Sequence, residues 1–226
     1  ESFAEGDPVE SDGLVIGSRV ASFGLTEQIH SAAPAFFIEG YLSPADRGAA
    51  ECARLEVATR AAIAAIGLSD SGYSIEFRSG AERSSLIEVN GRLGCDEGFG
   101  DLFEAVLGVQ PMYLAFLLAL GEAPTFERRS LRAALAYQCR YVAGRVRSVP
   151  SRAAAERLRA LGLCVGINVA PGEPTLDARD PRVHPHLAFA LAEDERSSRA
   201  AYVRARAGVD SLHFELEQEW LGETGS

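Results

Sequence analysis

Hydrophobic and polar residues alternate along several stretches of the chain, and this period of two predicts β-strands. Residues 14–25 alternate around two glycine positions, which predicts a strand, a turn and a second strand. Residues 72–78 and 85–90 alternate on either side of a short loop that contains Gly80. A glycine-bearing loop of this length between two such runs is typical of a β-hairpin.

Apolar residues spaced three or four apart predict helices between these strands. Residues 44–66 are predicted to be a helix in which Ser43 is the N-cap, Pro44 takes the first helical position and Gly67 ends the helix. Two short apolar helices follow, one from Phe99 to the residue before Gly108 and one over residues 111–120.

The spacer at residues 122–125 is the predicted domain boundary. After it the pattern predicts strands over residues 132–143, 163–170 and 187–192 and helices over residues 151–161 and 195–207. The expected fold class is therefore α+β, with one domain over residues 1–122 and a small α+β cap domain over residues 127–226.

The composition of the chain limits the classes of function that the protein can have. The chain has 226 residues, of which 47% are apolar, so it can bury a core. A formal net charge of -10 argues against nucleic-acid binding, which depends on clustered Lys and Arg. Because no run of about eighteen apolar residues occurs, we predict no membrane span and a soluble, cytoplasmic protein. All 22 basic residues are arginine, which excludes any chemistry that needs a lysine from this chain.

Two glutamates of the predicted hairpin are the candidate functional pair. A loop centred near Glu82 places Glu76 directly opposite Glu88, with Asn90 on the same face and Arg92 just beyond. Two carboxylates about 5 Å apart repel by roughly 3 kcal/mol at an effective dielectric constant of 20. A divalent cation such as Mg²⁺ would relieve this repulsion. The alternative is that both side chains turn into water, and a register shift by one residue would separate them onto opposite faces.

The segment I-E-V-N-G-R-L-G at residues 87–94 follows a strand that contains E-F. This pattern resembles the metal-binding signature of ATP-grasp carboxylate–amine ligases. The stretches at residues 1–6, 24–27, 36–44 and 96–111 resemble further segments of that family, mainly of the ligases that resemble L-amino-acid ligases. Biotin carboxylase and carbamoyl-phosphate synthetase are more distant kin. The resemblance covers residues 1–122 well and the remainder weakly, and it implies the C-terminal part of an ATP-grasp domain.

The resemblance implies roles for individual residues. Glu76 and Glu88 correspond to the metal ligands through which ATP is bound, and Asn90 corresponds to a further ligand. Arg92 corresponds to the arginine that binds the acyl phosphate or the transferring phosphoryl group, so it is the implied catalytic residue. Asp96 corresponds to the acidic position that closes the motif.

Residues at the start of the chain resemble the family's hinge, which meets adenine and ribose. Glu1, Phe3 and Ala4 are the implied nucleotide-contacting positions, largely through their backbone. Asp12 lies where the family often has an acid after the hinge. Departures from the family pattern occur at Pro8, Gly91 and Cys95, and none of them removes an implied metal ligand.

The implied activity is that of an ATP-dependent ligase with ATP and Mg²⁺ or Mn²⁺ as cofactors. The enzyme would form an acyl phosphate from a carboxylate and join it to an amine. The expected partners are small carboxylates and amines such as amino acids, with no nucleic acid and no membrane, and a homodimer is compatible with the family. Because the phosphate-binding lysines of the family are absent, we expect them upstream of Glu1, so this chain alone should be inactive. The alternatives are an enzyme that resembles biotin carboxylase or carbamoyl-phosphate synthetase, and a non-catalytic nucleotide-binding remnant.

Overall fold

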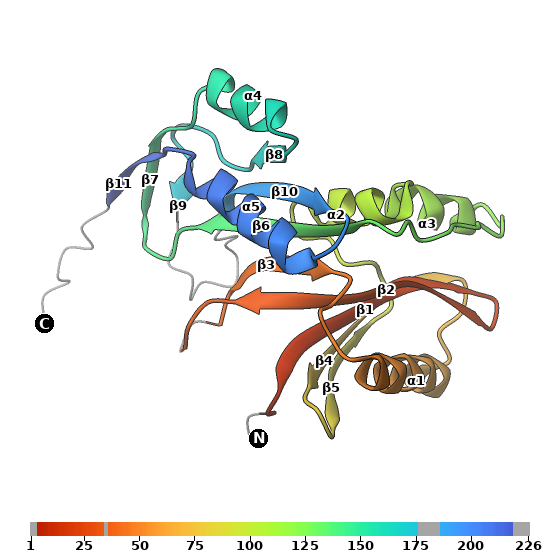
Figure 1. Ribbon diagram of the computed structural model, residues 1–226. Coiled ribbons are helices and arrows are strands. Elements are labelled where there is room, and N and C mark those ends of the chain that lie inside the picture. Colours follow the sequence, from red (N-terminus) through yellow and green to blue (C-terminus); the bar gives the residue numbers. More distant parts are fainter. Residues whose placement is uncertain (1–3, 34–35, 176–185, 219–226) are drawn as a thin grey trace, which may run out of the picture.

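The computed structural model describes residues 4–33, 36–175 and 186–218, which form two antiparallel sheets and five helices. This mixed architecture confirms the predicted α+β fold class. The order of strands in the large sheet is β5-β4-β1-β2-β3-β6-β10-β8 (Figure 1). Its strands are β1 (Asp7–Ile16), β2 (Arg19–His30), β3 (Ile38–Ser43), β4 (Ser71–Ser79), β5 (Ser84–Asn90), β6 (Arg132–Cys139), β8 (Cys164–Ile167) and β10 (His186–Asp194).

A small sheet and the helices complete the described part of the chain. No single helix there is long and apolar enough to cross a membrane. The helices Phe99–Leu107 and Pro111–Ala119 together have the length and composition, but they are bent by 87°. The small sheet has the order β11-β7-β9. Its strands are β7 (Gly144–Ser148), β9 (Pro174–Thr175) and β11 (Glu215–Gln218). The helices are α1 (Ala49–Ile66), α2 (Phe99–Leu107), α3 (Pro111–Ala119), α4 (Arg152–Ala160) and α5 (Ser198–Asp210).

The alternation of side chains along the strands divides the large sheet into two faces. On one face α1 covers the β4–β1 end and α5 covers the β6–β10 end (Figure 1). Val9 and Val15 of β1 belong to the apolar cluster under α1, whereas Leu14 belongs to the cluster around α2 on the opposite face. Glu10 and Asp12 have the same parity as Leu14 and therefore lie on the α2 face.

Aromatic rings form the centre of the cluster around α2. Phe103 lies with its ring centroid 5.3 Å from that of Phe23 and 4.9 Å from that of Phe99. Phe99 also lies 4.6 Å from Tyr41, centroid to centroid. These distances are typical of favourable aromatic packing. The cluster joins α2 to β2 and β3 and so supports the segment that connects β5 to α2.

The predicted start of the first long helix is wrong. Ser43 is the last residue of β3 and not an N-cap, and α1 begins at Ala49 with Gly48 at the N-cap. The reason is tertiary, because Ser43 pairs with Ala133 of β6 and the amide of Ala45 donates to Leu25 O at 2.8 Å. These bonds keep the segment extended. The predicted end is confirmed, since Gly67 takes a left-handed conformation with φ of 68°.

The single strand predicted over residues 132–143 is also wrong. The chain leaves the large sheet after Cys139, and Gly144 begins β7 in the small sheet. A side chain at Gly144 would collide with the carbonyl oxygen of Glu217, so this crossing requires glycine.

The spacer at residues 122–125 separates β3 from β6 in sequence, yet these two strands pair in the large sheet. The division into two domains stays a prediction.

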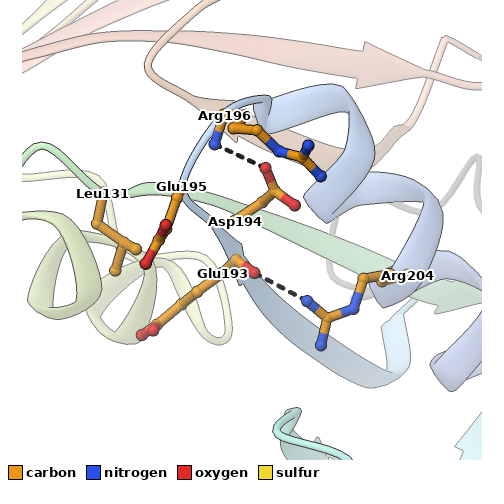
Figure 2. Close-up of a pocket in the computed structure, with 6 residues that line it drawn as sticks. All are labelled: Leu131, Glu193, Asp194, Glu195, Arg196 and Arg204. Carbon is orange, nitrogen blue, oxygen red and sulfur yellow. Dashed lines mark hydrogen bonds between the residues drawn. The ribbon is translucent and has the colours of Figure 1, made fainter.

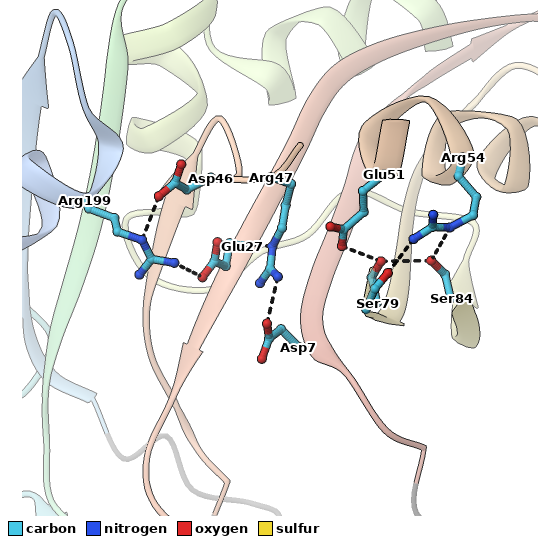
Figure 3. Close-up of polar contacts among 10 residues, drawn as sticks. Asp7, Glu27, Asp46, Arg47, Glu51, Arg54, Ser79, Ser84 and Arg199 are labelled. Carbon is cyan, nitrogen blue, oxygen red and sulfur yellow. Dashed lines mark hydrogen bonds and ion pairs between the residues drawn. The ribbon is translucent and has the colours of Figure 1, made fainter. Parts of the chain in front are cut away.

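A buried glutamate links α5 to the segment before α1 (Figure 3). Glu27 of β2 accepts from Arg199 Nη2 at 2.9 Å and lies 3.4 Å from Arg47 Nε. Arg47 also pairs with Asp7 at 2.7 Å, and Arg199 pairs with Asp46 at 2.8 Å. This network connects β1, β2, the segment before α1, and α5.

A second polar network fixes the hairpin of β4 and β5 against α1 (Figure 3). Arg54 of α1 donates to Gly80 O at 2.6 Å and to Ser84 Oγ at 3.2 Å. Ser79 donates to Glu51 Oε1 at 2.7 Å. The hairpin turn is therefore anchored to a helix, which restrains the position of the two strands that carry the predicted glutamate pair.

Candidate functional site

The hairpin brings the two predicted glutamates together. Glu76 of β4 pairs directly with Glu88 of β5, so their side chains share one face of the sheet. The predicted register is confirmed, but its cause differs from the expected one. Near the turn Ser79 pairs with Ser84, a register that would place Ile87 opposite Glu76. An extra residue on β5 shifts the pairing by one and brings Glu88 into position; such bulges are common near active sites.

The neighbouring strand β1 adds two buried carboxylates. Glu10 pairs with Glu76, and Asp12 pairs with Ser74, which in turn pairs with Asn90 of β5. Glu10 was missed by the sequence analysis, because the first strand was predicted to start only at Leu14. The alternation continues back to Asp7, with Val9 on the face covered by α1 and Glu10 on the face of α2. This longer alternation in the sequence could have identified Glu10 as a member of the site.

A fifth carboxylate reaches this face from the segment after β5. Asp96 accepts a hydrogen bond from the hydroxyl group of Tyr41 at 2.6 Å, and its charge raises the pKa of Glu10 and of Glu76. The segment is held by the hydroxyl of Tyr137, which donates to Glu97 O at 2.7 Å. We call the surface formed by Glu10, Asp12, Glu76, Glu88 and Asp96 the acidic face.

Burial and mutual repulsion raise the pKa values of carboxyl groups in the acidic face. Desolvation by burial raises the pKa of Glu10 well above its usual value, and the charges of Asp12 and Glu76 add to this effect. Burial raises the pKa of Asp12 to about 7, although the Ser74 hydroxyl and the Gly94 amide favour its charged form. The pKa of Glu76 is raised by burial and by the charge of Glu88. A bound cation would offset all of these effects.

Two arginines border the acidic face. Burial raises the pKa of Glu76 and of Asp12; the charges of Arg78 and Arg92 offset part of this rise at Glu76, and the charge of Arg92 offsets part of it at Asp12. The Arg92 side chain is exposed, and one of its nitrogens donates to Leu93 O at 3.0 Å. A guanidinium group in this position can bind a phosphoryl or carboxylate oxygen beside the carboxylates. Its implied role in phosphoryl transfer stays a prediction.

The raised pKa of Asp12 predicts a pH-dependent stability. An unfolded aspartate titrates near 3.9, so between about pH 4 and 7 the folded state holds a proton that the unfolded state has lost. Stability from this group is therefore lost as the pH rises through that window. We expect Asp12→Asn to be more stable than the parent at pH 7.5 by on the order of 3 kcal/mol, and equally stable below pH 4. Urea unfolding in buffer with EDTA measures both.

The matched control for this substitution is Asp70→Asn. The Asp70 carboxylate is exposed and accepts a hydrogen bond from the amide of Gly17 at 2.7 Å, which lowers its pKa. Its stabilising effect is present at neutral pH and is lost in acid. Asp70→Asn should therefore gain no stability at pH 7.5, and an equal gain in both variants would contradict a specific burial effect at Asp12.

The implied hinge residues can be placed only in part. Ala4 is half-buried and precedes β1, three residues from Asp7. Glu1 and Phe3 lie outside the described residues. The nucleotide contacts implied for these three positions stay predictions.

The acidic face fits a divalent cation on its own chemistry. Within the described part of the chain no three His, Cys, Asp or Glu side chains cluster closely enough to hold a metal ion by themselves. Glu76, Glu88 and Asn90 offer two carboxylates and an amide oxygen, which suits Mg²⁺, because this ion usually keeps waters and substrate phosphates as its other ligands. Glu10 Oε2 and both carboxylate oxygens of Asp12 are buried and lack a hydrogen bond of ordinary geometry, so a cation nearby would stabilise their charge.

Among the described residues, two of the hollows lie outside the acidic face. One groove of about 430 Å³ runs along the ends of β1, β2 and β4 beside it and is lined by Gln28, His30 and Arg78 among others. The other lies between β10 and α5 (Figure 2). There Asp194 accepts from the amide of Arg196 at 2.8 Å and Arg204 donates to Glu193 O at 3.0 Å. These contacts stabilise the turn into α5.

Comparison with solved structures identifies the fold. The chain superposes on L-amino acid ligase from Bacillus licheniformis with a TM-score of 0.79 at 20% identity, covering 96% of this chain and 53% of that one. Phosphoribosylglycinamide synthetase from Anaerococcus prevotii gives 0.76 at 13% identity, with coverage of 96% and 55%. The chain has the ATP-grasp fold. Biotin carboxylase from Campylobacter jejuni shares this ATP-grasp fold with a TM-score of 0.70 at 14% identity, covering 96% and 48%.

The comparisons limit what the ATP-grasp fold implies for this chain. No family model matches the sequence, and no curated protein matches it. The chain spans about half the length of the ATP-grasp structures to which it is similar. The likeness therefore establishes the fold, and the activity rests on the site.

Proposed function

We propose that this chain is the part of an ATP-dependent carboxylate–amine ligase that holds the metal-bound end of the nucleotide. The intact protein would form an acyl phosphate from a carboxylate and ATP and then join it to an amine. The single observation that carries this proposal is the direct pairing of Glu76 with Glu88, with Asn90 and Arg92 next to them, on a sheet of ATP-grasp topology.

The proposed reaction has two balanced steps. A carboxylate oxygen of the first substrate attacks the γ-phosphorus of ATP, the bond to the bridging oxygen breaks, and ADP leaves. The amine nitrogen of the second substrate then attacks the acyl carbon, phosphate leaves, and the amine loses a proton. When bound, the divalent cation would neutralise charge on the phosphates.

The residues of this chain have distinct parts in that reaction. Glu76, Glu88 and Asn90 would hold the cation, and Arg92 would bind an oxygen of the transferring phosphoryl group. Transfer of this kind depends mainly on positioning and charge neutralisation. The anchored hairpin turn and the aromatic cluster behind the β5–α2 segment keep these four residues in fixed positions.

Support for a ligase that joins amino acids comes from the structural neighbours. One of them is an L-amino acid ligase and another is a phosphoribosylglycinamide synthetase. A biotin carboxylase is also among them, so bicarbonate must be tested as an alternative carboxylate.

The decisive experiment traps the acyl phosphate. The full-length protein is incubated with ATP, Mg²⁺, hydroxylamine and a panel of amino acids, with bicarbonate as a separate arm. We expect Mg²⁺-dependent ADP release together with a hydroxamate of one amino acid. ADP release with bicarbonate alone would favour the carboxylase alternative, and absence of Mg²⁺-dependent ADP release with every substrate would contradict the proposal.

A further inference from the structure

Glu10 is the least explained residue of the acidic face. Its side chain is 6% exposed, it pairs directly with Glu76, and Asp12 lies two residues further along the same strand. A buried carboxylate beside two others is unfavourable, because desolvation and repulsion both oppose its charge. Glu10 therefore does not stabilise the fold through its charge, and its presence requires another explanation.

A chain of hydrogen bonds fixes the orientation of Glu10. Gln28 of β2 donates from Nε2 to Glu10 Oε1 at 2.8 Å, a bond that is buried. Since this uses the amide nitrogen, the Gln28 carbonyl oxygen faces His30, whose Nε2 lies 2.8 Å from it and must donate. Glu10 is thus held through Gln28 by His30, at the end of β2.

Only one oxygen of Glu10 is used by this chain of bonds. Oε2 is buried and has no hydrogen-bond partner, and the charges of Asp12, Glu76 and Asp96 act on Glu10. A buried acceptor without a donor carries a free-energy penalty unless a positive group approaches it. The charges around Glu10 are those of the acidic face, where the proposed cation would lie.

We infer that Glu10 is a positioning residue for the cation: Gln28 and His30 orient it, and it acts on Glu76 from the neighbouring strand β1 without coordinating the metal. This inference rests on the proposed function. Glu10 Oε1 is already held by Gln28 and the residue is 6% exposed, so Glu10 is less accessible to a hydrated cation than the exposed Glu88. Groups that orient or polarise the ligands and bound waters of a metal typically change its affinity by 10- to 100-fold when they are replaced.

The test measures Mn²⁺ binding without nucleotide. The signal of free Mn²⁺ in electron paramagnetic resonance gives the dissociation constant for the full-length protein and its variants. Glu10→Gln should weaken binding by about 10- to 100-fold. Gln28→Met removes the hydrogen bonds of Gln28 to Glu10 and to His30 but leaves every charge in place. It should weaken binding by a smaller factor, which keeps the test informative if Glu10→Gln folds poorly.

Gln138→Met is the matched control for the hydrogen-bond variant. Gln138 lies on β6, and its amide donates to Leu212 O at 3.2 Å, away from the acidic face. The Mn²⁺ affinity of Gln138→Met should equal that of the parent. Thermal unfolding in EDTA separates binding from folding, and Glu10→Gln should unfold at the same or a higher temperature, because it removes one of the repelling charges.

Glu88→Gln distinguishes failure of the inference from failure of the proposed function. If Glu88→Gln abolishes Mn²⁺ binding while Glu10→Gln and Gln28→Met bind within twofold of the parent, the inference is wrong and the metal site stands. If Glu88→Gln binds Mn²⁺ as the parent does, or the parent binds none, both are wrong. Weaker binding in Glu10→Gln and Gln28→Met, with loss in Glu88→Gln, supports both.

Discussion

Glu88→Gln in the full-length protein should reduce Mg²⁺-dependent ATP turnover by about 100- to 1,000-fold, the range found when one group that stabilises developing charge is removed. The substitution keeps the size and the strand position of the side chain and removes its charge. Glu88 is exposed on β5, which is an edge strand of the large sheet, so folding should be unaffected. Steady-state ADP release at several Mg²⁺ concentrations and thermal unfolding check the two expectations.

The same substitution at Glu82 provides the control. Glu82 lies at the exposed turn of the same hairpin, between β4 and β5. Glu82→Gln should leave turnover within twofold of the parent. If Glu88→Gln retained full turnover at every Mg²⁺ concentration, the assignment of the acidic face as the metal site would be wrong.

Phe103→Ala should lower the free energy of unfolding by about 3–5 kcal/mol, because it removes a large side chain from a close-packed cluster and leaves a cavity. Phe103 is 2% exposed and contacts the rings of Phe23 and Phe99. For a chain of this size the midpoint of thermal unfolding should fall by roughly 6–20 °C. Urea unfolding followed by circular dichroism measures the change directly.

Loss of Phe103 should also affect the acidic face. Phe103 and Phe99 border a small apolar void together with Asp12, Leu93 and Gly94. The ring of Phe99 lies so close to Gly94 that a side chain at that position would collide with it. When Phe103 is removed, Phe99 can shift and release the segment that carries Arg92 and Asp96. We therefore expect weaker Mn²⁺ binding in this variant even at temperatures at which it is folded.

Phe116→Ala is the matched control in the neighbouring helix. Phe116 is 59% exposed on α3, so its replacement removes little buried surface. Its free energy of unfolding should stay within about 0.5 kcal/mol of the parent value. Equal losses in Phe103→Ala and Phe116→Ala would contradict the assignment of the aromatic cluster as the core of this face.

The hairpin shows how far local sequence predicts geometry. Alternation and a glycine-bearing loop located both strands, and the pairing of Glu76 with Glu88 was predicted correctly. The pairing of Ser79 with Ser84 at the turn would place Ile87 opposite Glu76. The bulge at Ile87 shifts the register by one residue, so that Glu88 takes this place. No rule of hairpin closure predicts this bulge, because it depends on how β5 packs beside β4 at the sheet edge.

The first long helix shows the opposite case. Ser43 and Pro44 form a good helix start by local criteria, and the prediction failed because β3 pairs with β6, which lies about ninety residues later in the sequence. A local N-cap contributes about 1 kcal/mol. Several ladder hydrogen bonds between central strands of a sheet outweigh that contribution, and they are invisible without the tertiary structure.

The sequence by itself determined the class of the fold, most of the helix ends at glycine and the spacing of Glu76, Glu88, Asn90 and Arg92, because these follow from side-chain periodicity and backbone conformation over a few residues. Only the tertiary structure decided that β1 lies against β4 and brings Glu10 and Asp12 beside Glu76. Strand order in a sheet depends on contacts between distant segments, and the electrostatics of the acidic face arise from that order. Glu10, Gln28 and His30 therefore became candidates only when the chain was folded.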